Sequence, residues 1–220
     1  GVVGFRILIA CLALGVAAIA AVGTVRSGIQ AGLVSEGAAL LGGDAEAEFT
    51  YRFANAQELD WMQTRAVAVS QVVDFRSMVV VERNETTERG LTQIKAVDAL
   101  YPLYGAPKLQ SGQSLDDALK GTGTHPAAVM ERLLADRLAL GIGDTFKLGT
   151  TIFQLADIIT YVPDGAGDGF GLGPRTLVMT KDLERSGLIA PGTLFSTKYR
   201  LRLEQNADLD QLANDVDVDL

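Results

Sequence analysis

The chain has 220 residues, of which 48% are hydrophobic, and its 27 acidic side chains outnumber the 19 basic ones to give a net charge of −8. This acidic balance argues against nonspecific binding to nucleic acid or to an anionic membrane surface. The length suffices for one domain with a substantial core or for two small lobes, and the lone cysteine, Cys11, cannot form an intrachain disulfide.

Residues 7–25 form an uninterrupted run of uncharged side chains between Arg6 and Arg26. As an α-helix with a rise of 1.5 Å per residue, the run covers roughly 28 Å, close to the hydrocarbon thickness of a bilayer. We therefore predict a transmembrane helix over 1–26, with the bulk of the chain on one side of the membrane. One arginine flanks each side, so the positive-inside rule does not orient this helix.

Two other interpretations of this segment remain open. The tripeptide at 18–20 (AIA) is similar to the cleavage site of a secretory signal peptide. The tetrapeptide at 8–11 (LIAC) is similar to a bacterial lipoprotein box, although uncharged residues continue well beyond Cys11, where a lipoprotein turns polar. In a transmembrane helix, Cys11 is a small lipid-facing or packing residue.

A stalk helix is predicted over 27–43. Apolar residues such as Ile29 and Leu33 recur at roughly helical spacing, and the glycine pair at 42–43 supplies a C-terminal stop signal. A helix that continues from the membrane into the following domain would be a mechanical stalk. The alternative is a membrane helix that ends near Arg26 and is followed by a separate surface helix.

Two segments far apart in the sequence share a strand-then-helix pattern. Aromatic and polar residues alternate over 48–53, and Asn55 then opens a helix with a capping-box-like pair. Apolar and polar residues alternate again over 195–203, and Asn206 opens a second helix. Two such units are typical of a split βαβ lobe, with everything between them inserted.

We therefore predict a βαβ lobe whose first part is 44–83 and whose second part is 191–220, with an inserted α/β lobe over 84–190. A further strand should follow the second unit, and the chain begins at Gly1 rather than at Met. We expect the chain to be a fragment in which this lobe is truncated.

The second of these strands carries a row of basic side chains on one face, namely Lys198, Arg200 and Arg202. We interpret the row as the solvated face of an amphipathic strand, with contact to lipid head groups or to an acidic partner as the alternative. The apolar stretches at 79–81 and 101–104 are interpreted as core rather than as a ligand groove.

The inserted lobe mixes predicted strands and helices. Strands are predicted over 91–98, 145–148, 151–159 and 176–179, and an aromatic turn over 101–105. The spacing of apolar residues predicts one helix from Pro126 to the glycines at 141–143 and another from Thr180. The predicted fold class is α+β, with no internal repeat.

No catalytic, cofactor or metal site is predicted. His125, the only histidine, is expected to flank a helix start, and no nucleophile motif such as G-x-S-x-G exists to partner it. The segment 164–169 is similar to half of a calcium loop, but Ala166 and Arg175 stand where oxygen ligands belong, so we predict a flexible solvent loop. No dinucleotide-binding or Walker motif is present, so the chain is not predicted to be an enzyme.

Five sequence blocks together resemble one protein family. They are GFRILIACLALGVAAIAAVGTV, LLGGD, LTQIKAVDALYPLYG, LLADRLALGIGDTFKLG and GPRTLVMTKDLERSGL. Over essentially its whole length the chain resembles FtsX/MacB-like ABC transporter permeases and, within them, the YbbP-type subfamily. The most specific stretches are Gly42-Gly43-Asp44, Ala96-Val97-Asp98, Tyr101-Pro102-Leu103-Tyr104-Gly105, Gly143-Asp144 and Gly173-Pro174-Arg175.

The resemblance implies an N-terminal transmembrane helix and stalk, then a MacB-like periplasmic domain, at the bacterial inner membrane. It implies a permease subunit that relays motion outward to move or extract lipophilic compounds, with ATP hydrolysis in a separate cytoplasmic ATPase and, in some members, a periplasmic esterase alongside. The alternative function is an extracytoplasmic sensor or ligand-binding domain of a membrane receptor. A receptor would continue into a cytoplasmic signalling module, whereas a permease would continue into several membrane helices.

Overall fold

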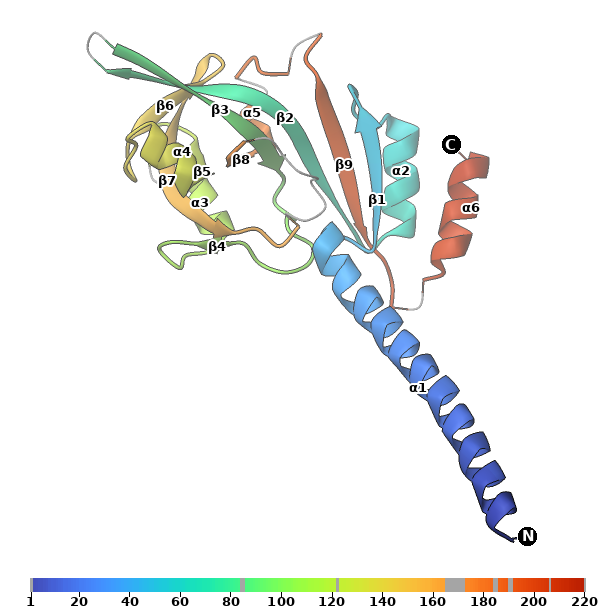
Figure 1. The fold of residues 1–220 in the computed structure, drawn as a ribbon. Helices are drawn as coiled ribbons and strands as arrows, with labels where there is room; N and C mark the ends of the chain where they lie inside the picture. The colour runs from blue at the N-terminus through green and yellow to red at the C-terminus, as the bar shows by residue number, and fades with distance from the viewer. Residues whose placement is uncertain are drawn as a thin grey trace. The chain divides into compact units, whose positions relative to one another are not determined.

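The structure, a computed structural model, describes residues 2–83, 86–121, 123–164, 173–183, 186–189, 192–205 and 207–219. The chain forms two compact units, Gly1–Ala38 and Ala39–Leu220. The first is entirely helical, whereas the second holds a large mixed sheet and all the remaining helices (Figure 1).

Helix α1 (Val2–Leu41) is a single uninterrupted helix. This continuity confirms the prediction of one long helix and contradicts the alternative of a helix that ends near Arg26. The helix stops before Gly42, whose φ of +75° is accessible to glycine at little cost. The glycine pair therefore acts as the predicted stop signal.

The predicted transmembrane helix is not confirmed. Of the helices formed by the described residues, none is both long enough and apolar enough to cross a membrane. Ile7, Leu8 and Cys11 belong to the predicted span, but their side chains lie outside the described part of the structure.

The second unit is organised around one sheet of nine strands. The strands are β1 (Ala45–Thr50), β2 (Ala68–Arg83), β3 (Thr86–Val97), β4 (Lys108–Leu109), β5 (Ala127–Glu131), β6 (Thr145–Leu148), β7 (Thr151–Tyr161), β8 (Arg175–Met179) and β9 (Phe195–Arg202). The helices are α2 (Ala56–Arg65), α3 (Leu115–Lys120), α4 (Arg132–Arg137), α5 (Thr180–Leu183) and α6 (Leu209–Asp219).

Six of the strands close into a barrel in the order β2-β3-β8-β5-β7-β6, because β6 pairs with both β7 and β2. The β3–β8 and β5–β7 pairs are parallel and the others are antiparallel, so the barrel is mixed. Strands β9 and β1 extend the sheet from the first half of β2, away from the barrel (Figure 1).

Alternate residues of the barrel strands form its core. Val79 and Val81 of β2 pack there with Phe153 of β7, as predicted for core, whereas Val80 between them faces outward and is half-buried. Helix α4 lies against the same cluster, where a Cβ on Gly90 would approach Leu134 Cδ1 to 2.7 Å. Glycine is therefore needed at this point of β3.

A second apolar cluster covers the outside of the barrel next to α3. Leu115 and Leu119 of α3 pack there with Tyr101, Val129 and Leu177. Ser114 caps this helix by accepting a hydrogen bond from the Asp117 backbone N–H at 3.1 Å. The sequence patterns did not predict α3, which is only six residues long.

The small lobe outside the barrel contains the two predicted strand-and-helix units. Strand β1, helix α2 and strand β2 form the first, with β9 inserted between the two strands; β9 and α6 form the second. Asn55 and Glu58 form the predicted capping box at the start of α2. Trp61 and Met62 of α2 pack on Tyr199 of β9, so this helix covers one face of the lobe. Asn206, the predicted start of the second helix, lies outside the described residues.

Two sequence predictions about local structure were wrong. Residues 127–131 form strand β5 instead of the predicted helix, because they pair with β7 and β8 and are nearly all buried. An unbroken apolar run fits a buried strand as well as a helix, and the helix itself begins only at Arg132. Strand β1 ends at Thr50, since Tyr51 has a φ of +61° and leaves the strand before Phe53.

Candidate functional site

The basic row on β9 is buried, contrary to the predicted solvated face. Arg200 is 1% exposed and Lys198 is 8% exposed. These side chains lie on the face of the small lobe opposite α2, where other parts of the chain cover them. Arg202 donates a hydrogen bond to the Leu103 carbonyl, and its guanidinium lies 5.0 Å from the centre of the Tyr104 ring. The aromatic turn therefore covers this end of the row.

Asp164 is the centre of a buried charge network. Its side chain is fully buried, and Oδ2 accepts hydrogen bonds from Lys95 Nζ at 2.8 Å and from Arg200 Nη1. Oδ1 accepts a further bond from the Tyr101 hydroxyl at 2.7 Å. Arg200 also donates through Nε to Glu46 Oε2 at 3.0 Å. We call these five residues the ion-pair joint.

The ion-pair joint keeps its central carboxyl group ionised. Burial by itself raises the pKa of Asp164, but the charges of Lys95 and Arg200 outweigh burial and lower that pKa to about 2. Burial by itself lowers the pKa of the Arg200 guanidinium. The charge of Asp164 outweighs burial, so the pKa of Arg200 is raised. Asp164 and Arg200 therefore face each other as an ion pair at neutral pH.

The segment that follows α1 packs directly on this network. A Cβ on Gly42 would lie 2.8 Å from Arg200 Nη1, and a Cβ on Gly43 would lie 3.1 Å from Arg200 Cβ. Asp44 Oδ2 accepts hydrogen bonds from the Leu203 backbone N–H at 2.8 Å and from the Tyr104 hydroxyl at 2.7 Å. Because Gly42 and Gly43 have no side chains, the segment that follows α1 can lie directly against β9 and the aromatic turn.

The aromatic turn is also fixed at its start. Asp98 accepts hydrogen bonds from Ser70 Oγ at 2.8 Å and from the Gln71 backbone N–H at 2.7 Å. Tyr101 and Leu103 are 8% and 5% exposed, which confirms that 101–104 is core and not a ligand groove. Three blocks that carry the family resemblance, at 42–44, 96–98 and 101–105, therefore meet at one place in the fold.

The predicted solvent loop at 164–169 begins with a buried residue instead. Asp164 belongs to the ion-pair joint, so its oxygens are occupied by cations of the protein itself. Residues 165–172 lie outside the described part of the structure. Arg175, which stands at the position of a calcium-loop glutamate, forms an ion pair with Glu131 at 2.8 Å.

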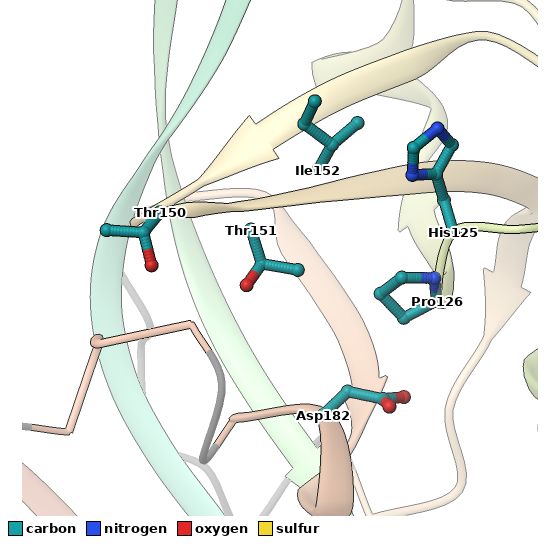
Figure 2. Close-up of a pocket in the computed structure, with 6 residues that line it drawn as sticks. All are labelled: His125, Pro126, Thr150, Thr151, Ile152 and Asp182. Atoms are coloured by element: carbon teal, nitrogen blue, oxygen red, sulfur yellow. The ribbon is translucent and has the colours of Figure 1, made fainter.

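The only histidine lies at the wall of a surface pocket (Figure 2). The pocket has a volume of about 340 Å³ and is lined by His125, Pro126, Thr150, Thr151, Ile152 and Asp182. His125 precedes strand β5, not a helix as predicted, and Asp182 comes from α5. Pro126 lies between them in the view, and none of the described residues that line the pocket is a Ser or a Cys.

The chemistry of these two sites differs. The ion-pair joint has fully engaged groups of fixed geometry and suits a structural or force-bearing role. The pocket offers an imidazole and a carboxylate beside apolar surface and suits contact with a ligand or a partner side chain. Among the described residues, no three His, Cys, Asp or Glu side chains come together as a metal site would require.

The ion-pair joint could not be found from the sequence by spacing. Asp164 is 69 positions from Lys95 and 36 from Arg200, and no local pattern links such residues. The sequence contained only a weak signal for this network. Three basic residues on one strand face, in a chain with a net charge of −8, indicate that acidic partners lie elsewhere in the sequence.

Comparison with known proteins gives a consistent set of relatives. Residues 7–218 match the family described as the MacB-like periplasmic core domain. The chain is 26% identical over 199 residues to the uncharacterized ABC transporter permease YbbP of Escherichia coli (strain K12), and the match covers 89% of this chain. It covers 23% of that protein, so the chain spans less than a quarter of its relative's length.

Solved structures of two extracytoplasmic regions are also similar. The extracellular domain of the noncanonic ABC-type transporter YknZ from Gram-positive bacteria is 12% identical, with 74% of this chain and 78% of that chain covered and a TM-score of 0.47. The periplasmic region of MacB from Actinobacillus actinomycetemcomitans is 10% identical, with 81% and 83% covered and a TM-score of 0.49.

Proposed function

The chain belongs to the MacB-like periplasmic core domain family, because residues 7–218 match the model of that family. We propose that the chain relays ATP-driven motion in a YbbP-type ABC transporter permease. In this proposal the permease exports or extracts lipophilic compounds, and the described sheet unit acts outside the cytoplasm. The family match and the 26% identity to a permease support the assignment.

The observation that carries the proposal is the position of the ion-pair joint. Segment 42–44 is bonded to β9 and to the aromatic turn, and Arg200 of β9 is bonded through Asp164 to Lys95 of the barrel strand β3. A displacement of segment 42–44 therefore reaches the small lobe and the barrel through short, buried contacts. Such a connection is what a force-relaying domain needs.

We further propose the division of labour along the chain that the sequence predicted. Residues 1–26 anchor the protein in the bacterial inner membrane and 27–43 form the stalk. Residues 44–83 and 191–220 form the βαβ lobe, and 84–190 form the inserted lobe. Support for the anchor comes from the uncharged run at 7–25, in which the described apolar side chains are exposed, with Leu14 and Ile19 each at 76%.

The partners in this proposal follow from the similarity to a permease. The ATPase of such a transporter is a separate subunit in this proposal, so ATP hydrolysis is assigned to a cytoplasmic ABC ATPase. The remaining partners in the proposal are the lipid bilayer, a lipophilic substrate and the periplasmic esterase that the family resemblance implies.

The anchor is tested by extracting bacterial membranes with alkaline carbonate. We expect the chain to stay in the membrane pellet with 7–25 attached. A soluble mature chain that begins after Ala20 would show instead that this segment is a cleaved signal peptide.

The relay is tested in vesicles that contain the whole permease and its ATPase. Asp44→Asn weakens the acceptor for Leu203 and Tyr104, so the amount of substrate moved per ATP hydrolysed should fall while the protein stays folded. Asp60→Asn, on the exposed side of α2, is the matched control and should leave this ratio unchanged. An unchanged ratio for Asp44→Asn would rule out a relay through this segment.

One observation favours a second function. The pocket at His125 has a volume of about 340 Å³, within the range of small-molecule sites, so the chain could instead be a ligand-binding domain of a receptor. A receptor function predicts that His125→Ala abolishes a ligand response, whereas the relay predicts normal transport for this variant.

A further inference from the structure

The outer face of the barrel carries apolar and basic side chains on three adjacent strands, all exposed except Val80, which is half-buried. Its members are Arg76, Met78 and Val80 of β2, Arg89 and Leu91 of β3, and Lys147 of β6. We call this set the outer patch. Met78 is 41% exposed and Leu91 is 44% exposed, whereas their neighbours Val79 and Gly90 point into the barrel and are buried.

The strand register makes the outer patch continuous. Met78 lies directly opposite Leu91, and Val80 lies opposite Arg89 on one side and Lys147 on the other. Directly opposed side chains in antiparallel strands have Cβ atoms about 5 Å apart. The patch is therefore an apolar strip with a cation at each side of Val80, and the exposed Glu82 of β2 bounds it beyond Val80, so its three cations outnumber one carboxylate on this face.

The cations of the outer patch differ from the other arginines of the barrel. Arg83 pairs with Glu88 at 3.0 Å and Arg175 with Glu131 at 2.8 Å. Among the acidic side chains that the structure describes, none pairs with Arg76, Arg89 or Lys147. Three cations that have no ion-pair partner among the described residues and that surround apolar side chains are unusual in a chain with a net charge of −8.

The patch continues into the pocket. Lys147 lies opposite Ile152 of β7, and Ile152 also lines the pocket beside His125 and Pro126 (Figure 2). Ile152 is 45% exposed, so Lys147 is the only residue that separates Val80 of the apolar strip from the apolar wall of the pocket in the strand register. A pocket of about 340 Å³ at the edge of a flat surface can hold one large side chain of a binding partner.

The charge pattern selects the kind of partner. A second copy bound by the same face about a two-fold axis would bring cations against cations, which is unfavourable. A small ligand has no enclosed cavity on the flat strip itself. We infer that the outer patch is a docking surface for a partner protein that presents apolar side chains flanked by aspartate or glutamate, with one apolar side chain inserted beside His125. This inference does not depend on the proposed transport function.

The test places a photo-crosslinking amino acid at Leu91 in the full-length protein in its own cells, with Gln57 on the exposed surface of α2 as the control position. Mass spectrometry of the crosslinked product identifies the contact peptide. We expect one partner protein, captured at position 91 and not at 57, whose contact peptide carries carboxylates next to apolar residues. A crosslink to lipid, to a second copy, to a peptide without carboxylates, or to nothing would overturn the inference.

The second step measures binding of that synthetic contact peptide to the purified protein. The triple variant Arg76→Glu, Arg89→Glu and Lys147→Glu should bind at least about tenfold more weakly, and a peptide with lysine in place of its carboxylates should restore binding. Leu91→Ser, which keeps the charges, should also weaken binding because the contact is partly apolar. These side chains are exposed, so the thermal unfolding midpoints should be nearly unchanged. Equal affinities for all variants would refute the docking surface.

Discussion

Removing the charge of Asp164 should destabilise the protein severely at neutral pH. In Asp164→Asn, Lys95 and Arg200 stay buried and lose the carboxylate that both of them contact. Breaking a buried ion pair by removing one partner costs about 3–5 kcal/mol, because the remaining charge is left uncompensated. The shift of the Asp164 pKa from 3.8 to about 2 independently corresponds to about 2 kcal/mol of stabilisation.

The pH dependence provides a sharper test than the size of the effect. Because the pKa of Asp164 is lower in the folded state, its contribution is complete above the unfolded-state pKa of 3.8 and is lost as the pH falls towards about 2. The wild-type protein and Asp164→Asn should therefore differ by several kcal/mol at pH 7, and the difference should shrink below about pH 4 and vanish only below about pH 2.

Urea unfolding of the whole chain in detergent, followed by fluorescence, measures this difference. Trp61 is the single tryptophan and is 8% exposed in the small-lobe core, so it reports directly on unfolding of that lobe. Asp136→Asn is the matched control, since Asp136 pairs with Arg132 only at 3.8 Å on the surface and should contribute less than about 0.5 kcal/mol. Equal free energies of unfolding for the wild type and Asp164→Asn at pH 7 would refute the ion-pair joint as a stabilising element.

Three further predictions concern the segment that follows α1, the small lobe and the stalk. Gly42→Ala should destabilise the protein by about 1–2 kcal/mol, because Gly42 has a φ of +75° and an added Cβ would contact Arg200. Gly37 lies in α1 with open space around it, so Gly37→Ala should not destabilise the protein, and thermal unfolding of the two variants tests the difference. Asn55→Ala should lower the free energy of unfolding by about 1 kcal/mol in a urea titration through loss of the N-cap of α2. Leu33→Pro should kink α1 at a cost of about 3 kcal/mol and uncouple ATP turnover from substrate movement in vesicles. Leu33→Ala should have only a mild effect on this coupling. Normal coupling in the proline variant would show that the stalk does not transmit force.

The sequence allowed good prediction of elements whose signals are local. The capping box at Asn55, the helix stop at Gly42 and the hairpin strands around Gly149 each depend on residues within a few positions of one another. The strand at 127–131 was missed because a short apolar run has no periodicity that separates a buried strand from a helix. Closure of the barrel through β2–β6 pairing depends on segments about 70 residues apart and leaves no local signal.

The candidate site shows the same limit more strongly. Alternation along β9 correctly placed Lys198, Arg200 and Arg202 on one face, but alternation cannot tell whether water or another segment covers that face. The cover comes from the aromatic turn and from Asp164, which are distant in sequence. The burial of Arg200 at 1% exposure therefore had to be observed.

The physical contrast between buried and exposed ion pairs explains why the joint suits a relay. Arg52 and Glu58 also form a close pair, at 2.7 Å, but Arg52 is 51% exposed, so water can replace the partner at a cost of at most about 1 kcal/mol. A displacement there would be absorbed by breaking the pair. In the ion-pair joint, separating Arg200 from Asp164 leaves two buried charges apart, at a cost of several kcal/mol. The less costly response to a small movement of segment 42–44 is for β9 and the barrel to move with it, and this response is the one that the proposed function requires.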